Sequence, residues 1–179
     1  MIKGKELQDL LSEGHRPIPT RWVEVDKNAH KRRTKGPYVP PAFKSRLVGR
    51  GDLEDAAGLR TDSPTCDQEG HHILYSWAAS NRLRLRSGDI SNAYFQGKEL
   101  DRLLLLKPPK GGLPDPEIDD ETMILARVPI YGTKDAGRQF WKQLREKIIA
   151  AGLEENPLCD AFYHLTDSSN VTQVMLCLL

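Results

Sequence analysis

An alternating stretch that leads into an acidic turn, over residues 83–97, constrains the fold of this chain more than any other feature. Apolar and basic side chains alternate through residues 83–86, and this period is typical of a half-buried β-strand. Asp89 follows closely, and the aromatic pair Tyr94 and Phe95 comes next. We therefore expect a strand with a carboxylate at its end. Taken singly, the same residues also fit an aspartate that caps a turn and rings that pack in a core.

Charge is unevenly distributed along the chain. The 179 residues are enough for one ordinary domain or for a fragment of a larger one. Residues 1–50 carry 12 Lys and Arg against 5 Asp and Glu, which leaves 14 against 20 for residues 51–179, although the net charge is only +1. A basic amino-terminal part can contact the phosphates of a nucleic acid. More often, such a part is only solvated.

Three cysteines, Cys66, Cys159 and Cys177, are an odd number at wide spacings. We therefore expect no disulfide framework and a reducing compartment. Because no signal peptide and no apolar run of membrane-spanning length is recognised, an intracellular location, cytoplasmic or nuclear, is expected. Cys66 with His71 and His72 suggests zinc ligands, but no second ligand pair follows at the spacing of a zinc site. Both histidines are therefore expected to be ordinary surface residues of a helix.

Hydrophobic spacing predicts further helices and strands. The helices are expected over residues 6–14, from residues 63–68 onward, and over residues 140–152. The second helix is expected to bury Ile73, Leu74, Trp77 and Ala78. The strands are expected at residues 22–25, 44–51, 103–106 and 123–128, with a hairpin at residues 162–165 and 171–179. Prolines and the basic residues 31–35 indicate a flexible or extended segment before the second strand.

Residues 89–95 resemble the first catalytic motif of reverse transcriptases, in the form found in copia-type retrotransposons. Two other segments match the same family in the same order. Residues 44–51 have the form Lys-x-Arg-Leu-Val-x-Arg-Gly, and residues 129–141 contain Tyr-Gly-x-Lys followed by Ala136 and Arg138. Three ordered matches make the resemblance far more specific than any one of them.

The resemblance implies an α+β fold, a partial right-hand polymerase made of the fingers and part of the palm, with an antiparallel palm sheet and packed helices. It covers residues 41–179, which follow a basic, proline-containing and partly flexible segment of residues 1–40. The family performs RNA-directed DNA polymerisation by two-metal nucleotidyl transfer. It implies two Mg²⁺ ions as cofactors, and deoxynucleotides and an RNA or DNA primer–template as partners.

Three residues of the first motif have roles implied by the resemblance. Asp89 is expected to bind both catalytic metal ions, and the carbonyl of Ile90 to support one of them. Tyr94 is expected to lie under the sugar of the nucleotide, where its ring would exclude a 2′-hydroxyl group.

The second motif supplies cations. Lys44, Arg46 and Arg50 are expected on one face of a strand, where they would clamp a triphosphate. An edge strand protected by charge would show the same pattern.

The third motif contributes Gly132, Lys134 and Arg138 as nucleotide-binding positions. It departs from the family pattern at Asp135, where the family has a glutamine close to the nucleotide. A carboxylate there is expected to repel phosphates.

The aromatic-x-Asp-Asp turn, which supplies the remaining metal-binding carboxylates of the family, is not found in this sequence. Since Asp89 alone cannot hold two cations, we expect a polyprotein fragment that is inactive as an isolated chain. The alternative is a non-catalytic nucleic-acid-binding relic or an inert pseudogene product. An unrelated basic interaction module is a third interpretation, which would require the three ordered matches to arise by chance.

Overall fold

The structure, a computed structural model, describes residues 1–34, 38–55, 57–119 and 121–178. The chain forms two compact units. The first unit comprises Met1–Leu59 and Glu99–Ala136, and the second comprises Arg60–Lys98 and Gly137–Leu179. The first and second motifs of the resemblance therefore lie in different units, and the third motif crosses from one unit to the other.

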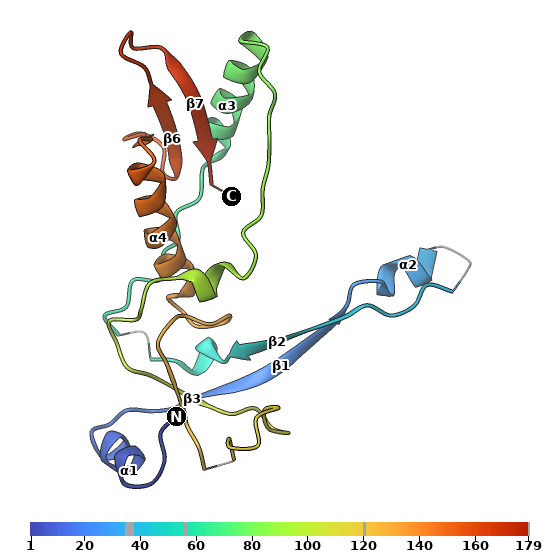
Figure 1. The fold of residues 1–179 in the computed structure, drawn as a ribbon, viewed down its shortest axis with the longest axis vertical. Helices are drawn as coiled ribbons and strands as arrows, with labels where there is room; N and C mark the ends of the chain where they lie inside the picture. The colour runs from blue at the N-terminus through green and yellow to red at the C-terminus, as the bar shows by residue number, and fades with distance from the viewer. Residues whose placement is uncertain (35–37, 56, 120, 179) are drawn as a thin grey trace. The chain divides into compact units, whose positions relative to one another are not determined.

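A four-stranded sheet organises the first unit (Figure 1). Its strand order is β2-β1-β3-β4. The strands are β1 (Ile18–Asp26), β2 (Phe43–Gly49), β3 (Leu104–Lys107) and β4 (Ile124–Ala126). The pairs β1–β2 and β3–β4 are antiparallel, whereas β1 and β3 are parallel. All four strands confirm predicted ones, but the parallel pair makes this sheet mixed rather than purely antiparallel.

Strand β3 lies in the core because both of its faces are covered. Leu104 and Leu106 pack in one apolar cluster with an isoleucine of β1. Leu105 points to the opposite face and packs in a second cluster with Leu7 of helix α1 (Gly4–Ser12). A strand buried on both faces requires a continuous apolar run, which explains the uninterrupted leucines of this segment.

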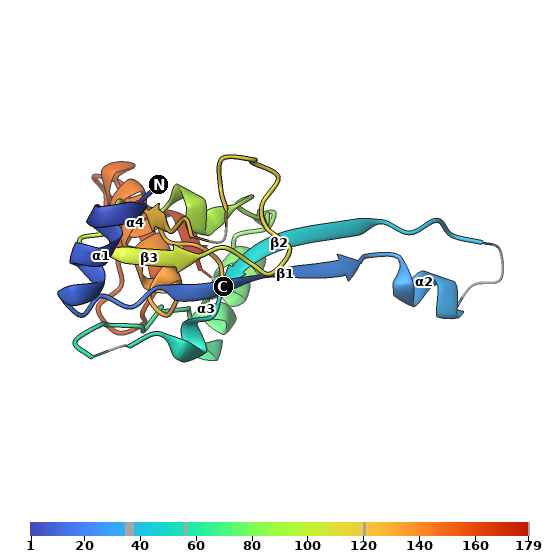
Figure 2. The same ribbon diagram turned by 90° about the horizontal axis from the view of Figure 1, so that it is seen from below.

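Strands β1 and β2 form a long two-stranded ribbon, which carries the short helix α2 (Ala29–Thr34) at its far end (Figures 1 and 2). The register pairs Asp26 with Phe43 at that end. The Oδ1 atom of Asp26 accepts hydrogen bonds from the backbone nitrogens of Asn28 and Ala42, each at 2.9 Å. One carboxylate therefore closes the ribbon, in a region predicted to be flexible or extended.

The basic residues 31–35 begin on α2. Lys31, Arg32 and Arg33 are exposed on this helix, and the guanidinium of Arg32 is paired with Asp26. Lys35 lies outside the described residues. This part of the basic cluster, for which phosphate contact and simple solvation were both considered, is thus located at the tip of the ribbon.

The second unit combines helices with a three-stranded antiparallel sheet of order β5-β6-β7 (Figure 1). Its main elements are α3 (Gln68–Ser80), α4 (Ala136–Ala150), β5 (Glu154–Glu155), β6 (Phe162–Thr166) and β7 (Thr172–Cys177). Short 3₁₀ helices are η1 (Gly51–Leu53) in the first unit and η2 (Ala93–Gln96) in the second. The predicted third helix and the predicted hairpin are confirmed. Within the described ranges, no helix is long and apolar enough to cross a membrane.

Residues 83–86, predicted as a half-buried strand, form no strand. They belong to an irregular stretch that is exposed from residue 81 to residue 90, and the side chains of Leu83 and Leu85 are 46% and 53% exposed. The prediction was wrong because a strand needs a neighbour that satisfies its backbone hydrogen bonds. Among the strands that the structure describes, none pairs with this stretch.

The buried face of α3 differs from the predicted one. Ile73 is 52% exposed, whereas Gly70 and Ala78 are buried and Leu74 packs against an apolar cluster of the second unit. Residues 70, 74 and 78 form one row at i, i+4 and i+8. The prediction is confirmed for Leu74 and Ala78 and wrong for Ile73, because the helix packs through the row that contains its smallest residue.

Replacing Leu105 by alanine is expected to lower the free energy of unfolding by about 2–5 kcal/mol, because the side chain is 2% exposed and its loss leaves a cavity. The matched control is Leu103→Ala, in the same run but 37% exposed, which should cost much less. Urea unfolding followed by circular dichroism measures both. Equal losses in the two variants would contradict the burial of β3.

Candidate functional site

Asp89 lies in the exposed irregular stretch of the second unit. Asp89 and Ile90 are both exposed, with Ile90 at 41%. Tyr94, in η2, is half-buried, and its ring packs edge-on against Phe140 of α4, with ring centroids 6.3 Å apart and planes at 80°. The structure therefore anchors Tyr94 by an aromatic contact and leaves the Asp89 carboxylate open to solvent.

Asp89 and Ile90 do not by themselves fit a two-cation centre. Such a centre holds two metal ions about 3.5–4 Å apart, which requires several ligands around them. Among the residues that the structure describes, no group of three His, Cys, Asp or Glu ligand atoms within 4.8 Å of one another includes Asp89. The described part of the chain therefore does not assemble the ligand set of such a centre.

The second and third motifs meet in the first unit. The backbone nitrogen of Gly49 donates to the carbonyl of Tyr131 at 2.8 Å, and that of Gly51 donates to the carbonyl of Gly132 at 3.0 Å. A Cβ atom on Gly51 would lie 2.1 Å from the Gly132 oxygen, closer than any real contact. Gly132 has a φ of +87°, which favours glycine. Glycine at both motif positions therefore permits the two backbones to touch.

Lys44 and Arg46 project from one face of β2, and both are exposed. The guanidinium carbon of Arg46 lies 5.4 Å from the centroid of the Tyr131 ring, within cation–π range. The register adds Arg21 of β1, which lies opposite Val48 and therefore on the same face. The sequence alone does not reveal the register between strands, so Arg21 was missed. The spacing of Arg21, Val23 and Val25 at every second residue does indicate that these three share one face of β1.

Arg50 does not continue this strand face, because β2 ends at Gly49 and the chain turns into η1. Its Nη2 atom lies 2.6 Å from Oδ2 of Asp52 in an exposed ion pair. The hydrogen bond from Arg50 holds the pKa of Asp52 below its ordinary value. Of the three cations predicted on one face, the structure places Lys44 and Arg46 there and Arg50 at the adjoining turn.

A buried ion cluster of Arg102, Glu54 and Asp135 supports the loop that contains Gly132 and Lys134. The Nη2 atom of Arg102 lies 2.5 Å from Oε1 of Glu54. Arg102 also donates through Nε and Nη2 to the two carboxylate oxygens of Asp135, at 2.9 and 2.7 Å. The backbone nitrogen of Lys134 donates to Oε2 of Glu54 at 2.8 Å. These buried charged groups therefore fix the position of the loop.

The carboxylate of Asp135 is part of this buried cluster: it pairs with Arg102, and its side chain is only 1% exposed. The expectation that it would repel phosphates is therefore wrong, since the charge is buried and paired with Arg102. Burial lowers the pKa of Arg102, but the hydrogen bonds and charge of Asp135, together with Glu54, raise it overall. The guanidinium therefore stays charged.

Arg138, on α4 in the second unit, is almost buried and interacts with two neighbouring side chains. Its Nη1 atom donates to Oδ2 of Asp62 at 2.7 Å, and its guanidinium carbon lies 4.4 Å from the ring centroid of Trp141. These contacts attach the segment before α3 to α4. In this position, Arg138 acts as a packing and positioning group.

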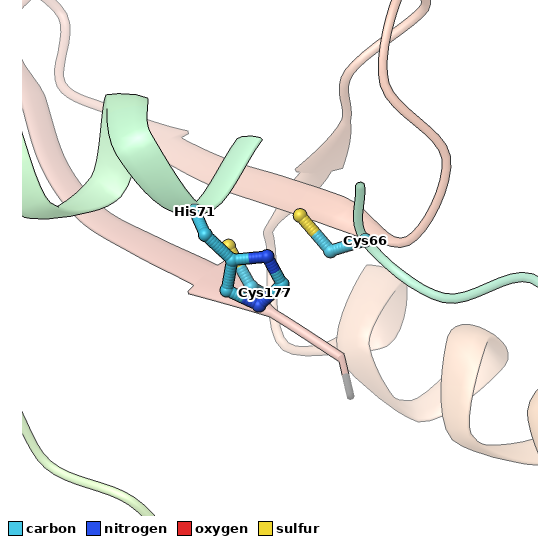
Figure 3. Close-up of side chains that lie close together, drawn as sticks. All are labelled: Cys66, His71 and Cys177. Carbon is cyan, nitrogen blue, oxygen red and sulfur yellow. The ribbon is translucent and has the colours of Figure 1, made fainter. Parts of the chain in front are cut away.

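A cluster of thiols lies elsewhere in the second unit. All three cysteines are free, as predicted, and the Sγ atoms of Cys66 and Cys159 are 3.8 Å apart. Burial raises the pKa of Cys66 to about 11 and that of Cys159 to about 12. Cys66, Cys177 and His71 bring ligand atoms within 4.8 Å of one another (Figure 3). His72 is exposed as predicted, whereas His71 is not an ordinary surface residue.

Replacing Arg102 by methionine is expected to lower the free energy of unfolding by about 3–5 kcal/mol, because two buried carboxylates lose their cation. The control is Lys3→Met, which removes a cation from an exposed ion pair with Asp119 and should cost less than about 1 kcal/mol. Urea titration monitored by tryptophan fluorescence measures both. A loss for Arg102→Met no larger than that of the control would contradict the assigned role of the cluster.

Comparison with known proteins agrees with the resemblance found in the motifs. A family model described as reverse transcriptase (RNA-dependent DNA polymerase) matches residues 6–178. Two similar relatives are retrovirus-related Pol polyproteins of Arabidopsis thaliana, from transposon RE2 (31% identical) and transposon RE1 (29% identical), each over 113 residues. These alignments cover 62% of this chain but only 8% and 7% of the relatives.

No solved structure gives a significant match. The family model spans nearly the whole chain, and the relatives are retrotransposon polyproteins, as the copia-type motifs predict. The chain belongs to the reverse transcriptase (RNA-dependent DNA polymerase) family.

Proposed function

We propose that this chain contributes the fingers and part of the palm of a right-hand polymerase that carries out RNA-directed DNA synthesis in a retrotransposon. The observation that carries the proposal is the meeting of two distant family motifs in the first unit, through the hydrogen bond from Gly51 to Gly132. In this proposal, residues 41–179 carry the polymerase part and residues 1–40 precede it. The chain spans less than a tenth of the length of its polyprotein relatives. RNA-directed DNA synthesis, an activity of the whole protein, is therefore part of the proposal.

Lys44 and Arg46 are proposed to bind the phosphates of a deoxynucleotide or of a primer–template. The guanidinium carbon of Arg46 lies 5.4 Å from the centroid of the Tyr131 ring, and the residue is exposed. A planar fork of this kind pairs well with phosphate oxygens. Arg50 and Lys134, which flank the contact between the two motifs, complete the proposed basic surface.

Asp89 is proposed as the family's first metal-binding carboxylate, with the Ile90 carbonyl beside it and Tyr94 under the nucleotide sugar. The solvent exposure of Asp89 and the anchoring of Tyr94 against Phe140 support this assignment. Gly132 shapes the nucleotide-binding surface, and Arg138 orients α4.

Reverse transcriptases generally use divalent metal ions, and Mg²⁺ is the ion proposed here. Because the described residues do not assemble a two-cation centre around Asp89, we propose that the isolated chain binds nucleic acid without joining nucleotides. The alternative of a nucleic-acid-binding relic gives the same behaviour in vitro. It differs only in whether a longer polyprotein restores the synthesis.

Primer extension on an RNA template, with Mg²⁺ and deoxynucleotides, is expected to show no incorporation by the chain and none by Asp89→Ala. In the same buffer, fluorescence anisotropy should detect binding to the primer–template that weakens with salt. The double variant Lys44→Ala, Arg46→Ala should reduce the slope of log affinity against log salt concentration by about 2, since each phosphate contact contributes nearly 1. The control Lys5→Ala, on α1, should leave the slope unchanged.

Two results would contradict this proposal. Incorporation that disappears in Asp89→Ala would show an active centre in the isolated chain. Salt-independent binding, or equal slopes for the double variant and Lys5→Ala, would remove the basic surface from the proposed function.

A further inference from the structure

Three segments of the second unit bring metal-binding atoms together at the start of α3. Cys66 precedes the helix, His71 lies in its first turns, and Cys177 ends β7 (Figure 3). The ligand atoms of these three residues lie within 4.8 Å of one another. The backbone fixes this arrangement, because the nitrogen of Cys66 donates to the carbonyl of Leu178 at 2.8 Å.

The spacing of the ligand atoms of Cys66, His71 and Cys177, all within 4.8 Å of one another, is compatible with a shared metal ion. Two thiolates bound at about 2.3 Å to a tetrahedral zinc ion lie about 3.8 Å from each other. The thiol of Cys159, which is not one of the proposed ligands, lies 3.8 Å from that of Cys66. Gly70 makes this density of sulfur possible, since a Cβ atom there would lie 2.5 Å from the sulfur of Cys66 and 2.6 Å from that of Cys159.

The imidazole of His71 is oriented as a metal ligand. Its Nδ1 atom lies 2.6 Å from the backbone carbonyl of Asp67, which can only accept, so Nδ1 carries the proton and Nε2 keeps a lone pair. Nε2 is buried and has no hydrogen-bond partner among the described residues. A metal-bound histidine usually has this arrangement, in which one ring nitrogen donates to a backbone carbonyl and the other nitrogen is left to bind the metal.

We propose that Cys66, His71 and Cys177 bind a zinc ion, which ties the start of α3 to the end of β7. Two thiolates and one imidazole are a ligand set that zinc prefers. A second group, Cys66 with Asp67 and Cys159, is less suitable. Its carboxylate already accepts hydrogen bonds from the Gly70 nitrogen at 2.7 Å and from the Cys159 thiol at 3.1 Å.

This site is separate from the polymerase proposal, since no residue of it belongs to the three motifs. Its role is structural: β7 and the start of α3 are far apart in the sequence, and a metal ion shared between them stabilises the folded state. The metal is zinc rather than the ions of nucleotidyl transfer, because thiolates select soft ions and carboxylates select magnesium.

The test uses the full chain, reduced and freed of metal by a chelator, then titrated with Zn²⁺ alone. One equivalent of zinc should bind, measured by competition with a chromophoric chelator and by elemental analysis. Co²⁺ in place of zinc should give the thiolate-to-metal charge-transfer absorption of a tetrahedral sulfur site. The melting temperature should rise on addition of zinc.

The matched variants are His71→Gln and His72→Gln, neighbours on the same helix. Loss of a group that only supports a metal ligand weakens metal binding by up to about 100-fold. Because His71 is itself a proposed ligand, His71→Gln should weaken zinc binding by at least about 100-fold, whereas His72→Gln should leave it unchanged. Cys177→Ser provides a second test and should weaken both the binding of zinc and the charge-transfer band, to which Cys66 still contributes. Circular dichroism in the absence of metal checks that each variant folds.

Failure of the folded, reduced chain to bind zinc would overturn the proposal. So would binding that both histidine variants retain, or a cobalt spectrum without thiolate absorption. None of these results bears on nucleic-acid binding, which is measured separately.

Discussion

The pairing of one buried guanidinium, that of Arg102, with the carboxylates of Glu54 and Asp135 is the interaction on which the first unit most depends. A buried charge is tolerated only when it is paired and hydrogen-bonded. Here the two carboxylates receive donors from Arg102 and from the Lys134 backbone. The donors and acceptors come from three segments, which lie after β2, before β3 and before α4. Their hydrogen bonds and ion pairs therefore fix the positions of these segments relative to one another. The contact between the second and third family motifs follows from it.

That constraint also explains why the third motif can depart from its family pattern. A carboxylate at Asp135 appears unfavourable when only the neighbouring sequence is considered, because the motif is otherwise basic. Its partner Arg102, and Glu54, which shares that guanidinium, are distant in sequence and belong to no motif. The side chain of Asp135 is buried and paired with Arg102, so the change concerns the support of the loop.

Much of the fold could be predicted because its signals are local. The leucine run of β3 indicates a strand, and the glycine at residue 152 indicates the end of α4, whatever the rest of the chain does. Residues 83–86 have an equally clear alternating pattern, yet they are exposed, since a pattern cannot supply a partner strand. Periodicity predicts a preference, whereas the existence of a strand depends on what lies beside it.

The site was predicted in the same uneven way. Lys44 and Arg46 were correctly placed on one face because alternation along a single strand determines that face. Arg21 was missed because its position depends on register between strands. The grouping of Cys66, His71 and Cys177 was also missed, because zinc-site spacings describe ligands close in sequence, and Cys177 reaches the group only through the pairing of β6 and β7.

The ribbon of β1 and β2 is fastened differently at its two ends. At its base, the buried Thr20 donates a hydrogen bond to the carbonyl of Lys107; at its tip, Asp26 binds the backbone on both sides of α2. Between them, Trp22 and Val25 are 40% and 50% exposed. An isolated two-stranded ribbon is only marginally stable in water. Its middle can therefore open while the core stays folded, and its amide protons exchange with solvent at a low free-energy cost that is set locally.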